Sequence, residues 1–214
     1  MAKKASKGAC LLCKSSYTGT GMAKHLQSCL PEHLENQLQK KKVKSQPIFH
    51  IMVQGAYSPE YWLHLKISGN ARLKDLDQFL RDIWLECCGH MSSFRQGRHE
   101  LEMGSKLIDV VRPDMELLHE YDFGDTTECL VKVIAYYEGP IKGKNLIQIL
   151  ARNDPPEILC NECGQALAVE ICVECQSEGS GWLCESCAKE HGCDEEMRLA
   201  VANSPRTGVC GYTG

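Results

Sequence analysis

Fourteen cysteines stand out in this chain of 214 residues, and eight of them form four Cys-x-x-Cys pairs. Such a pair directs two sulfur atoms from one turn toward a single ion, which is typical of a metal knuckle rather than of a disulfide. The chain begins with lysines and has no apolar segment behind them of the kind that an export signal needs, so we expect a reducing, cytoplasmic location. The cysteines therefore predict bound zinc.

The N-terminal set consists of one pair, Cys10 and Cys13, followed after eleven residues by His25 and then Cys29. His25 and Cys29 are four residues apart, so a helix would place them on one face. Four such ligands suit a tetrahedral Zn²⁺. We predict a small zinc finger over residues 1–38, with a small core made by Tyr17, Met22 and Leu26.

The C-terminal set holds three more pairs and a histidine: Cys160, Cys163, Cys172, Cys175, Cys184, Cys187 and His191. Two tetrahedral sites need an eighth ligand, which is Cys210 or Cys193. We favour Cys210, because the glycines near it allow a tight turn around a metal-bound sulfur. Cys193 is the alternative, since only one residue separates it from His191. Three zinc ions are expected for the whole chain.

The spacing of these C-terminal pairs resembles the cross-braced zinc modules of the B-box and RING classes. This resemblance implies that the first and third pairs share one ion. The second pair then shares another with His191 and the eighth ligand. Pairing of consecutive pairs, as in a zinc ribbon, is the alternative. Residues 157–214 contain few large apolar side chains, so we expect metal to supply the folding energy of this module.

Three cysteines remain outside these sets: Cys87, Cys88 and Cys129. We expect them to be buried as small apolar groups, which is the usual role of an isolated cysteine. A redox role for Cys87 and Cys88 is the alternative, although direct neighbours rarely form a good disulfide.

The middle segment, residues 48–150, is the part with enough apolar residues for an ordinary core. Alternation of apolar and polar residues predicts half-buried strands over 49–54 and 62–67, and further strands are expected near 115–121, 129–137 and 146–150. Apolar residues at spacings of three and four predict a long helix from about Leu73 to Cys87, with Asn70 as its N-cap and Gly89 as its end. The fold class is therefore α+β, with a central, mostly antiparallel sheet, one long helix and two small zinc-stabilised modules.

This middle segment resembles the plasmid pRiA-type open-reading-frame-three-like family. The resemblance lies in residues 62–67, 76–84, Gly89-His90 and, most specifically, Tyr121-Asp-Phe-Gly-Asp125. It covers about half of the chain and implies a compact α+β domain. It implies no activity.

Charge divides the chain into three parts, with a net +7 in residues 1–46, −4 in 47–150 and −7 in 151–214. A basic linker at 39–47 separates the first two parts. The positive end favours contact with DNA or RNA, and the candidate contacts are Lys3, Lys4, Lys7, Lys14 and Lys24. The acidic C-terminal module favours a protein partner, and no apolar run is long enough for a membrane.

We therefore expect a non-enzymatic zinc protein that binds nucleic acid, protein or both. The alternative is a nucleic-acid-processing or hydrolytic enzyme with its site around His119 and Asp122, where several proton-transfer groups gather. Convergence of these side chains with His90 in one pocket would support that alternative.

Overall fold

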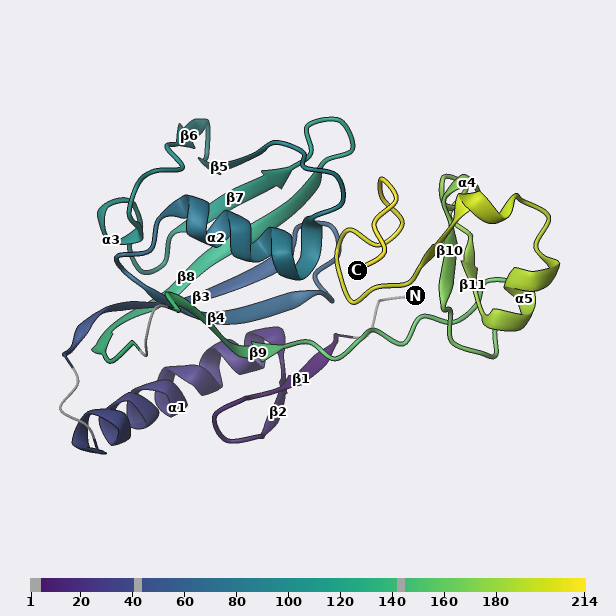
Figure 1. The fold of residues 1–214 in the computed structure, drawn as a ribbon. Coiled ribbons are helices and arrows are strands. Elements are labelled where there is room, and N and C mark those ends of the chain that lie inside the picture. The colour runs from purple at the N-terminus through teal and green to yellow at the C-terminus, as the bar shows by residue number, and fades with distance from the viewer. Residues whose placement is uncertain (1–4, 41–43, 142–144) are drawn as a thin grey trace.

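The computed structural model describes residues 5–40, 44–141 and 145–214. At its centre lies a seven-stranded sheet with strand order β6-β5-β7-β8-β3-β4-β9, in which neighbouring strands are antiparallel (Figure 1). Its strands are β3 (Gln46–Gly55), β4 (Trp62–Ser68), β5 (Ser92–Gln96), β6 (His99–Leu101), β7 (Glu116–Tyr121), β8 (Thr127–Gly139) and β9 (Ile147–Arg152). The predicted α+β class with its antiparallel sheet is confirmed.

Two apolar cores lie on opposite faces of this sheet. Phe49 and Ile51 of β3 belong to the core that helix α2 (Leu73–Leu80) completes. Ile48 points the other way and packs in the core that helix α1 (Gly19–Lys40) completes. Figure 1 shows these two helices on either side of the sheet.

Helix α1 places four residues at helical spacing onto the sheet: Met22, Leu26, Leu30 and Leu34. Two short paired strands precede it, β1 (Lys7–Ala9) and β2 (Ser16–Thr18). Among the helices of the described residues, neither α1 nor any other is long and apolar enough to cross a membrane.

Strand β4 differs from the half-buried strand expected, because all seven of its residues are buried. Two of the polar residues that produce the alternation, His50 and His64, are hydrogen-bonded to each other on the α1 side of the sheet. His50 Nε2 lies 2.9 Å from His64 Nδ1, and His64 Nε2 lies 2.9 Å from the Gly19 carbonyl oxygen at the start of α1. With that carbonyl as acceptor, His64 donates from Nε2 and accepts the Nε2–H of His50 on Nδ1. The pair therefore joins two strands to the first turn of α1.

The predicted long helix begins later than expected and changes its winding near its end. Arg72, not Asn70, is the N-cap of α2, and its backbone N–H donates to the Asp75 carboxylate at 2.7 Å. Beyond Leu80 the helix continues as one π-helical turn, η1 (Arg81–Leu85). The helical segment thus ends before Cys87. A one-turn helix, α3 (Leu107–Val110), lies further along the chain.

The C-terminal module is a small three-stranded sheet, in the order β11-β10-β12, with short helices around it. Its elements are β10 (Glu170–Cys172), α4 (Val173–Gln176), β11 (Trp182–Leu183), α5 (Glu185–Glu190), η2 (Glu195–Met197) and β12 (Arg198–Ala200). Its buried apolar cluster consists of Cys172, Leu183 and Ala188. So small an interior cannot fold the module by burial alone.

The segments that enter and leave this module are hydrogen-bonded to each other through two asparagines. The Asn153 side-chain amide donates to Asn203 Oδ1 at 2.7 Å, and the Asn203 amide donates to the Asn153 carbonyl at 3.0 Å. We call residues 203–214 the C-terminal tail. The tail runs back onto the central domain, where Ser204 Oγ donates to the Trp84 carbonyl at 2.6 Å. The segment predicted as one module, 157–214, therefore ends in a tail that contacts the central domain.

Candidate metal centres

Four groups of cysteine and histidine side chains stand out in the part of the chain that the structure describes. In each group the ligand atoms all lie within 4.8 Å of one another. Three groups combine three sulfurs with one imidazole, and one has four sulfurs, which are donor sets that zinc prefers. Each group has the donors and the spacing to hold one zinc ion. This is one group more than the sequence predicted.

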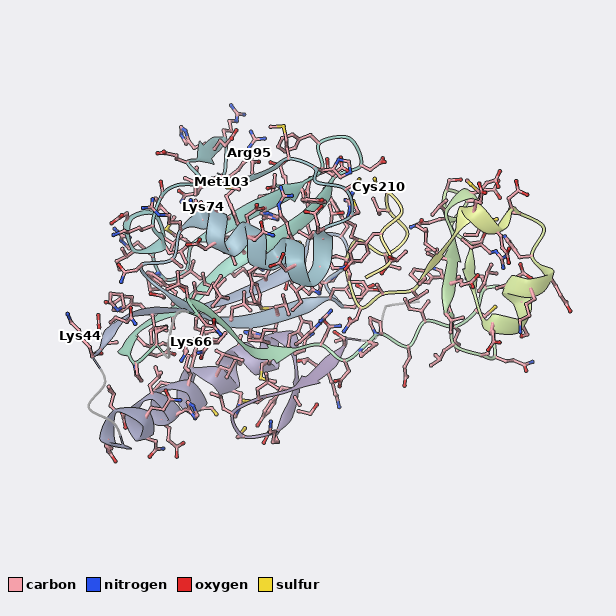
Figure 2. All side chains as sticks on the ribbon, in the orientation of Figure 1. Lys44, Lys66, Lys74, Arg95, Met103 and Cys210 are labelled. Carbon is pink, nitrogen blue, oxygen red and sulfur yellow. The ribbon has the colours of Figure 1, made fainter. Side chains whose placement is uncertain are left out.

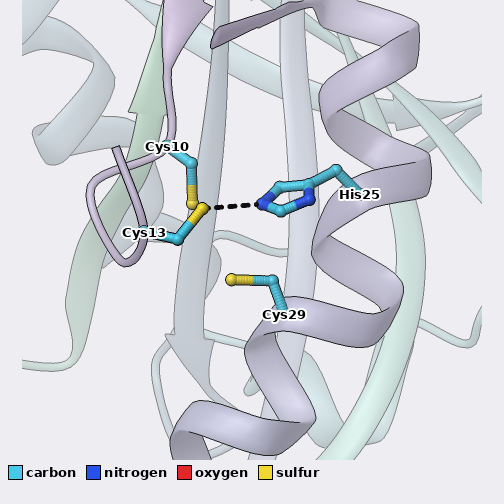
Figure 3. Close-up of side chains that lie close together, drawn as sticks. All are labelled: Cys10, Cys13, His25 and Cys29. Atoms are coloured by element: carbon cyan, nitrogen blue, oxygen red, sulfur yellow. Dashed lines mark hydrogen bonds between the residues drawn. The ribbon is translucent and has the colours of Figure 1, made fainter. Parts of the chain in front are cut away.

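The N-terminal group joins a turn to a helix (Figure 3). Cys10 and Cys13 lie on the turn between β1 and β2, and His25 and Cys29 lie on successive turns of α1. The Cys13 Sγ atom is 3.2 Å from His25 Nε2. Hydrogen bonds from the backbone and hydroxyl of Ser15 lower the pKa of the Cys13 thiol to about 6. A thiolate, the form that binds metal, is therefore available at neutral pH.

This finger is not separate from the central domain. Its turn bonds to β9 through the Leu11 N–H, which donates to the Leu150 carbonyl at 2.8 Å. At Gly8 a Cβ atom would lie 2.0 Å from the Arg152 carbonyl oxygen, so the close contact requires glycine. Met22 and Leu26, expected to form a small core with Tyr17, belong to the larger core beneath the sheet.

The C-terminal module contains two groups whose cysteine pairs alternate along the chain. The first and third pairs form one group: Cys160, Cys163, Cys184 and Cys187. The second pair joins the histidine and a further cysteine in the other: Cys172, Cys175, His191 and Cys193. This alternation is the arrangement that a cross-braced module requires, and it differs from the consecutive pairing of a ribbon.

Each of these two groups has at least one thiol whose pKa is lowered. Hydrogen bonds from the Ser186 hydroxyl and the Cys187 backbone N–H lower the pKa of the Cys184 thiol to about 6. At Cys172 burial acts in the opposite direction, but hydrogen bonds led by the Cys175 backbone N–H lower the thiol pKa to about 7. Amide donors aimed at a sulfur from within the same turn are what a metal knuckle supplies to its thiolates.

A carboxylate links the two groups of the module. Glu162 lies between Cys160 and Cys163, and its Oε1 is 2.8 Å from His191 Nδ1. This contact raises the pKa of His191 and fixes the imidazole so that Nε2 faces the sulfurs, 3.5 Å from Cys175 Sγ. A carboxylate behind a histidine ligand commonly orients it in zinc sites.

The structure places Cys193, and not the favoured Cys210, beside the second pair and His191. The Sγ of Cys193 lies 3.6 Å from Cys175 Sγ, whereas Cys210 is on the tail, beside the central domain (Figure 2). The single residue between His191 and Cys193 is no obstacle, because the backbone turns away from helix α5 at His191.

The fourth group was missed from the sequence and consists of Cys87, Cys88, His90 and Cys210. Cys88 Sγ lies 2.8 Å from His90 Nε2, and Cys210 Sγ lies 3.3 Å from the same nitrogen. Cys87 and Cys88 are therefore not both buried as small apolar groups, since Cys88 is exposed. Cys129 is fully buried, as expected. The close spacing of Cys87, Cys88 and His90 is a signal for three of the four ligands, but the spacing gives no sign of Cys210.

The C-terminal tail packs on the turn at Tyr121–Asp125. The Arg206 side chain is fully buried, donates to Asp122 Oδ2 at 2.6 Å and lies over the Tyr121 ring, 4.8 Å from its centre. It also donates to the Thr127 hydroxyl at 2.9 Å. This guanidinium lowers the pKa of Asp122 although desolvation acts in the opposite direction. The carboxylate of Asp122 and the backbone carbonyl of Asp125 thus hold the Arg206 side chain in this turn.

The proton-transfer groups considered for catalysis do not meet in one pocket. His119 is fully buried, with Nε2 2.8 Å from Asp77 Oδ1, under helix α2. Asp122 pairs with Arg206, and its Oδ2 lies 3.4 Å from His90 Nε2. His119 and Asp122 therefore face different partners, and the arrangement that would support the enzyme is not observed in the described residues.

Of the candidate nucleic-acid contacts, Lys7, Lys14 and Lys24 are exposed on β1, on the knuckle and on α1. Lys3 and Lys4 lie outside the described residues, as do residues 41–43 of the predicted basic linker.

No protein-family model matches the chain, and no curated protein matches it significantly. Among solved structures, the chain is similar to a protein of unknown function, MM3350, from Methanosarcina mazei Go1. The two share 16% identity over 58% of this chain and 77% of the other, with a TM-score of 0.42. Likeness at this level carries no argument about function. The resemblance of the middle segment to the pRiA-type family has no support from a family model.

Proposed function

We propose that this protein is a non-enzymatic, zinc-stabilised interaction protein whose N-terminal finger binds nucleic acid. One observation carries the proposal: residues 1–31 contain five lysines and no aspartate or glutamate. The three described lysines are exposed around the Cys10–Cys29 group. A zinc ion there fixes the knuckle that carries Lys14 against the helix that carries Lys24. Such a surface suits the phosphates of DNA or RNA.

The test is fluorescence anisotropy of the full chain with a 20-base-pair DNA duplex and a single-stranded RNA at several salt concentrations. We expect binding that weakens as salt rises. The double variant Lys14→Glu/Lys24→Glu should bind more weakly and lower the slope of log K against log salt by about one per lysine removed. Lys74→Glu is the matched control, because Lys74 is exposed on α2 on the opposite face of the sheet (Figure 2). An equal loss in this control, or no binding by the natural chain, would refute the proposal.

A protein partner for the C-terminal module is the second proposal, and an exposed apolar patch favours it. Leu159, Leu167 and Val169 are each about half exposed, and Leu159 pairs with Leu167 across a β-bridge. The patch lies within a segment of net charge −7. A module with so little interior that leaves three large apolar side chains in water is typical of a docking surface.

The expected partner offers apolar and basic side chains. Capture from a cell lysate with the natural chain should retain a protein that Leu167→Asp/Val169→Asp loses. A variant with Leu11→Asp, an exposed leucine on the finger, is the control and should retain it. Identical capture by all three chains would contradict this second proposal.

A further inference from the structure

We propose that Cys87, Cys88, His90 and Cys210 bind a fourth zinc ion, and that this ion fastens the C-terminal tail to the central domain. The inference goes beyond the proposed function, because it concerns how the chain holds its own C-terminal tail. It does not depend on what the protein binds.

The distances between these ligand atoms are close to those of a tetrahedral zinc site, where they are about 3.3–3.8 Å. Cys87 Sγ lies 3.6 Å from Cys88 Sγ, which lies 3.8 Å from Cys210 Sγ. Cys210 Sγ in turn lies 3.3 Å from His90 Nε2. The distance between Cys88 Sγ and His90 Nε2, 2.8 Å, is shorter than this range.

Apolar burial does not explain why these groups meet. Cys88 and Cys210 are both exposed and stand 122 residues apart in the chain. Bringing two exposed thiols to one imidazole removes little apolar surface from water. Burial of Arg206 and Tyr212 docks the tail, but burial of the thiols themselves contributes little to their approach. A metal ion bound by both segments supplies a driving force for this approach.

The backbone on both sides of the group is unusual. Cys210 has a φ of 49°, in the left-handed region that non-glycine residues rarely adopt, between Gly208 at 80° and Gly211 at 69°. The π-helical turn η1 ends two residues before Cys87. Strained non-glycine residues and single π turns are concentrated at functional sites, because ligand binding there offsets the free-energy cost of the strained backbone.

An arginine on the tail faces the sulfurs of this group, and the carboxylate of Asp122 lies 3.4 Å from His90 Nε2. A zinc ion bound by three thiolates carries a net charge of −1, and the guanidinium of Arg206 lies 3.5 Å from Cys87 Sγ. Arg206 is itself fixed on Asp122, at 2.6 Å. Arg206 and Cys210 are four residues apart on the tail, so one segment delivers both the counter-charge and a ligand.

The experiment measures zinc per chain by elemental analysis in the full-length, reduced protein purified with zinc. We expect four ions in the natural chain and three in Cys210→Ser. Cys88→Ser should also hold three zinc ions. Because Cys88 and Cys210 are both exposed, the same loss in both variants would not be explained by a local folding defect in either one. Cys129→Ala is the matched control and should keep four, because Cys129 belongs to none of the groups. Hydrogen exchange of residues 203–214 should accelerate in the two serine variants alone.

Three ions in the natural chain, or an unchanged count in both serine variants, would overturn the proposal. A Cys88–Cys210 disulfide that persists in the presence of reductant, in place of zinc, would overturn it too. Nucleic-acid binding by the same variants separates this result from the proposed function. The lysines lie on the α1 side, so Cys210→Ser should bind as the natural chain does. If the natural chain does not bind nucleic acid, the proposed function fails, but the test of the fourth zinc ion by zinc counts is still valid.

Discussion

The finger and the C-terminal module use the same Cys-x-x-Cys turn but draw stability from different sources. The finger helix places Met22, Leu26 and Leu30, all fully buried, into a core shared with the sheet. Burying each such side chain contributes about 1.5–3 kcal/mol. The C-terminal module has one buried leucine, Leu183, in its small cluster. Structural zinc contributes about 10–16 kcal/mol in small zinc domains.

This difference shows that a zinc knuckle does not by itself tell how much a fold depends on metal. The surroundings decide this. In the finger, the knuckle packs on the sheet, and the metal only fixes the conformation of a turn. In the C-terminal module, the knuckles pack on one another, and metal binding takes the place of a hydrophobic core.

The largest expected effect is the response to zinc removal by a strong chelator under reducing conditions. The C-terminal module should unfold completely, and the amides of residues 160–200 should lose their protection from hydrogen exchange. Helix α1 should remain protected, because its apolar face stays on the sheet. If α1 loses protection at the same chelator concentration as the module, the contrast between the two regions is wrong.

A core substitution should produce the next largest effect. Leu26→Ala should lower the free energy of unfolding of the finger and central domain by about 2–5 kcal/mol, because it leaves a cavity between α1 and the sheet. Chemical denaturation followed by tryptophan fluorescence measures this. Leu11→Ala, at an exposed position on the same finger, should change the stability by less than about 0.5 kcal/mol. Equal effects would mean that the finger does not share the core.

The carboxylate behind His191 should have a smaller effect that is confined to the module. Glu162→Ala should weaken zinc binding at the group that contains Cys172 by about 10- to 100-fold, because it frees the imidazole to rotate. Competition with a chromophoric chelator reports this affinity. Glu178→Ala, an exposed acid of the same module, should leave it unchanged. A loss at the group that contains Cys160 instead would contradict the assignment.

The last expected effect is a pH dependence specific to the finger side of the sheet. Burial lowers the pKa of His50 to about 3 and that of His64 to about 4. The unfolded chain, with histidine pKa near 6.5, therefore binds more protons between pH 6.5 and 4. Stability should fall as the pH drops through this window, by at most about 1.4 kcal/mol per pH unit for each histidine.

His50→Gln tests this, because glutamine can still donate to His64 Nδ1 but does not titrate. The slope of stability against pH should be smaller than in the natural chain, while protonation of the zinc ligands affects both proteins alike. An identical slope would show that the buried pair does not contribute.

Local patterns predicted much of the sheet. The alternation over 49–54 and 62–67 corresponds to β3 and β4, because side chains of a strand alternate between two faces. Strands β5 and β6 were missed, since they are short and mostly polar and owe their pairing to β7. The N-cap was misplaced because Arg72 acts through its backbone N–H and not through a typical capping side chain.

The sequence alone determined the ligand sets that lie close together along the chain, since a Cys-x-x-Cys turn brings its sulfurs together without distant contacts. Only the tertiary structure decided between Cys193 and Cys210, and only it revealed the group that Cys210 completes. That group requires the tail to return across the molecule and Arg206 to enter the turn at Asp122. Contacts between residues so far apart depend on the packing of the whole chain, and residue spacing carries no information about them.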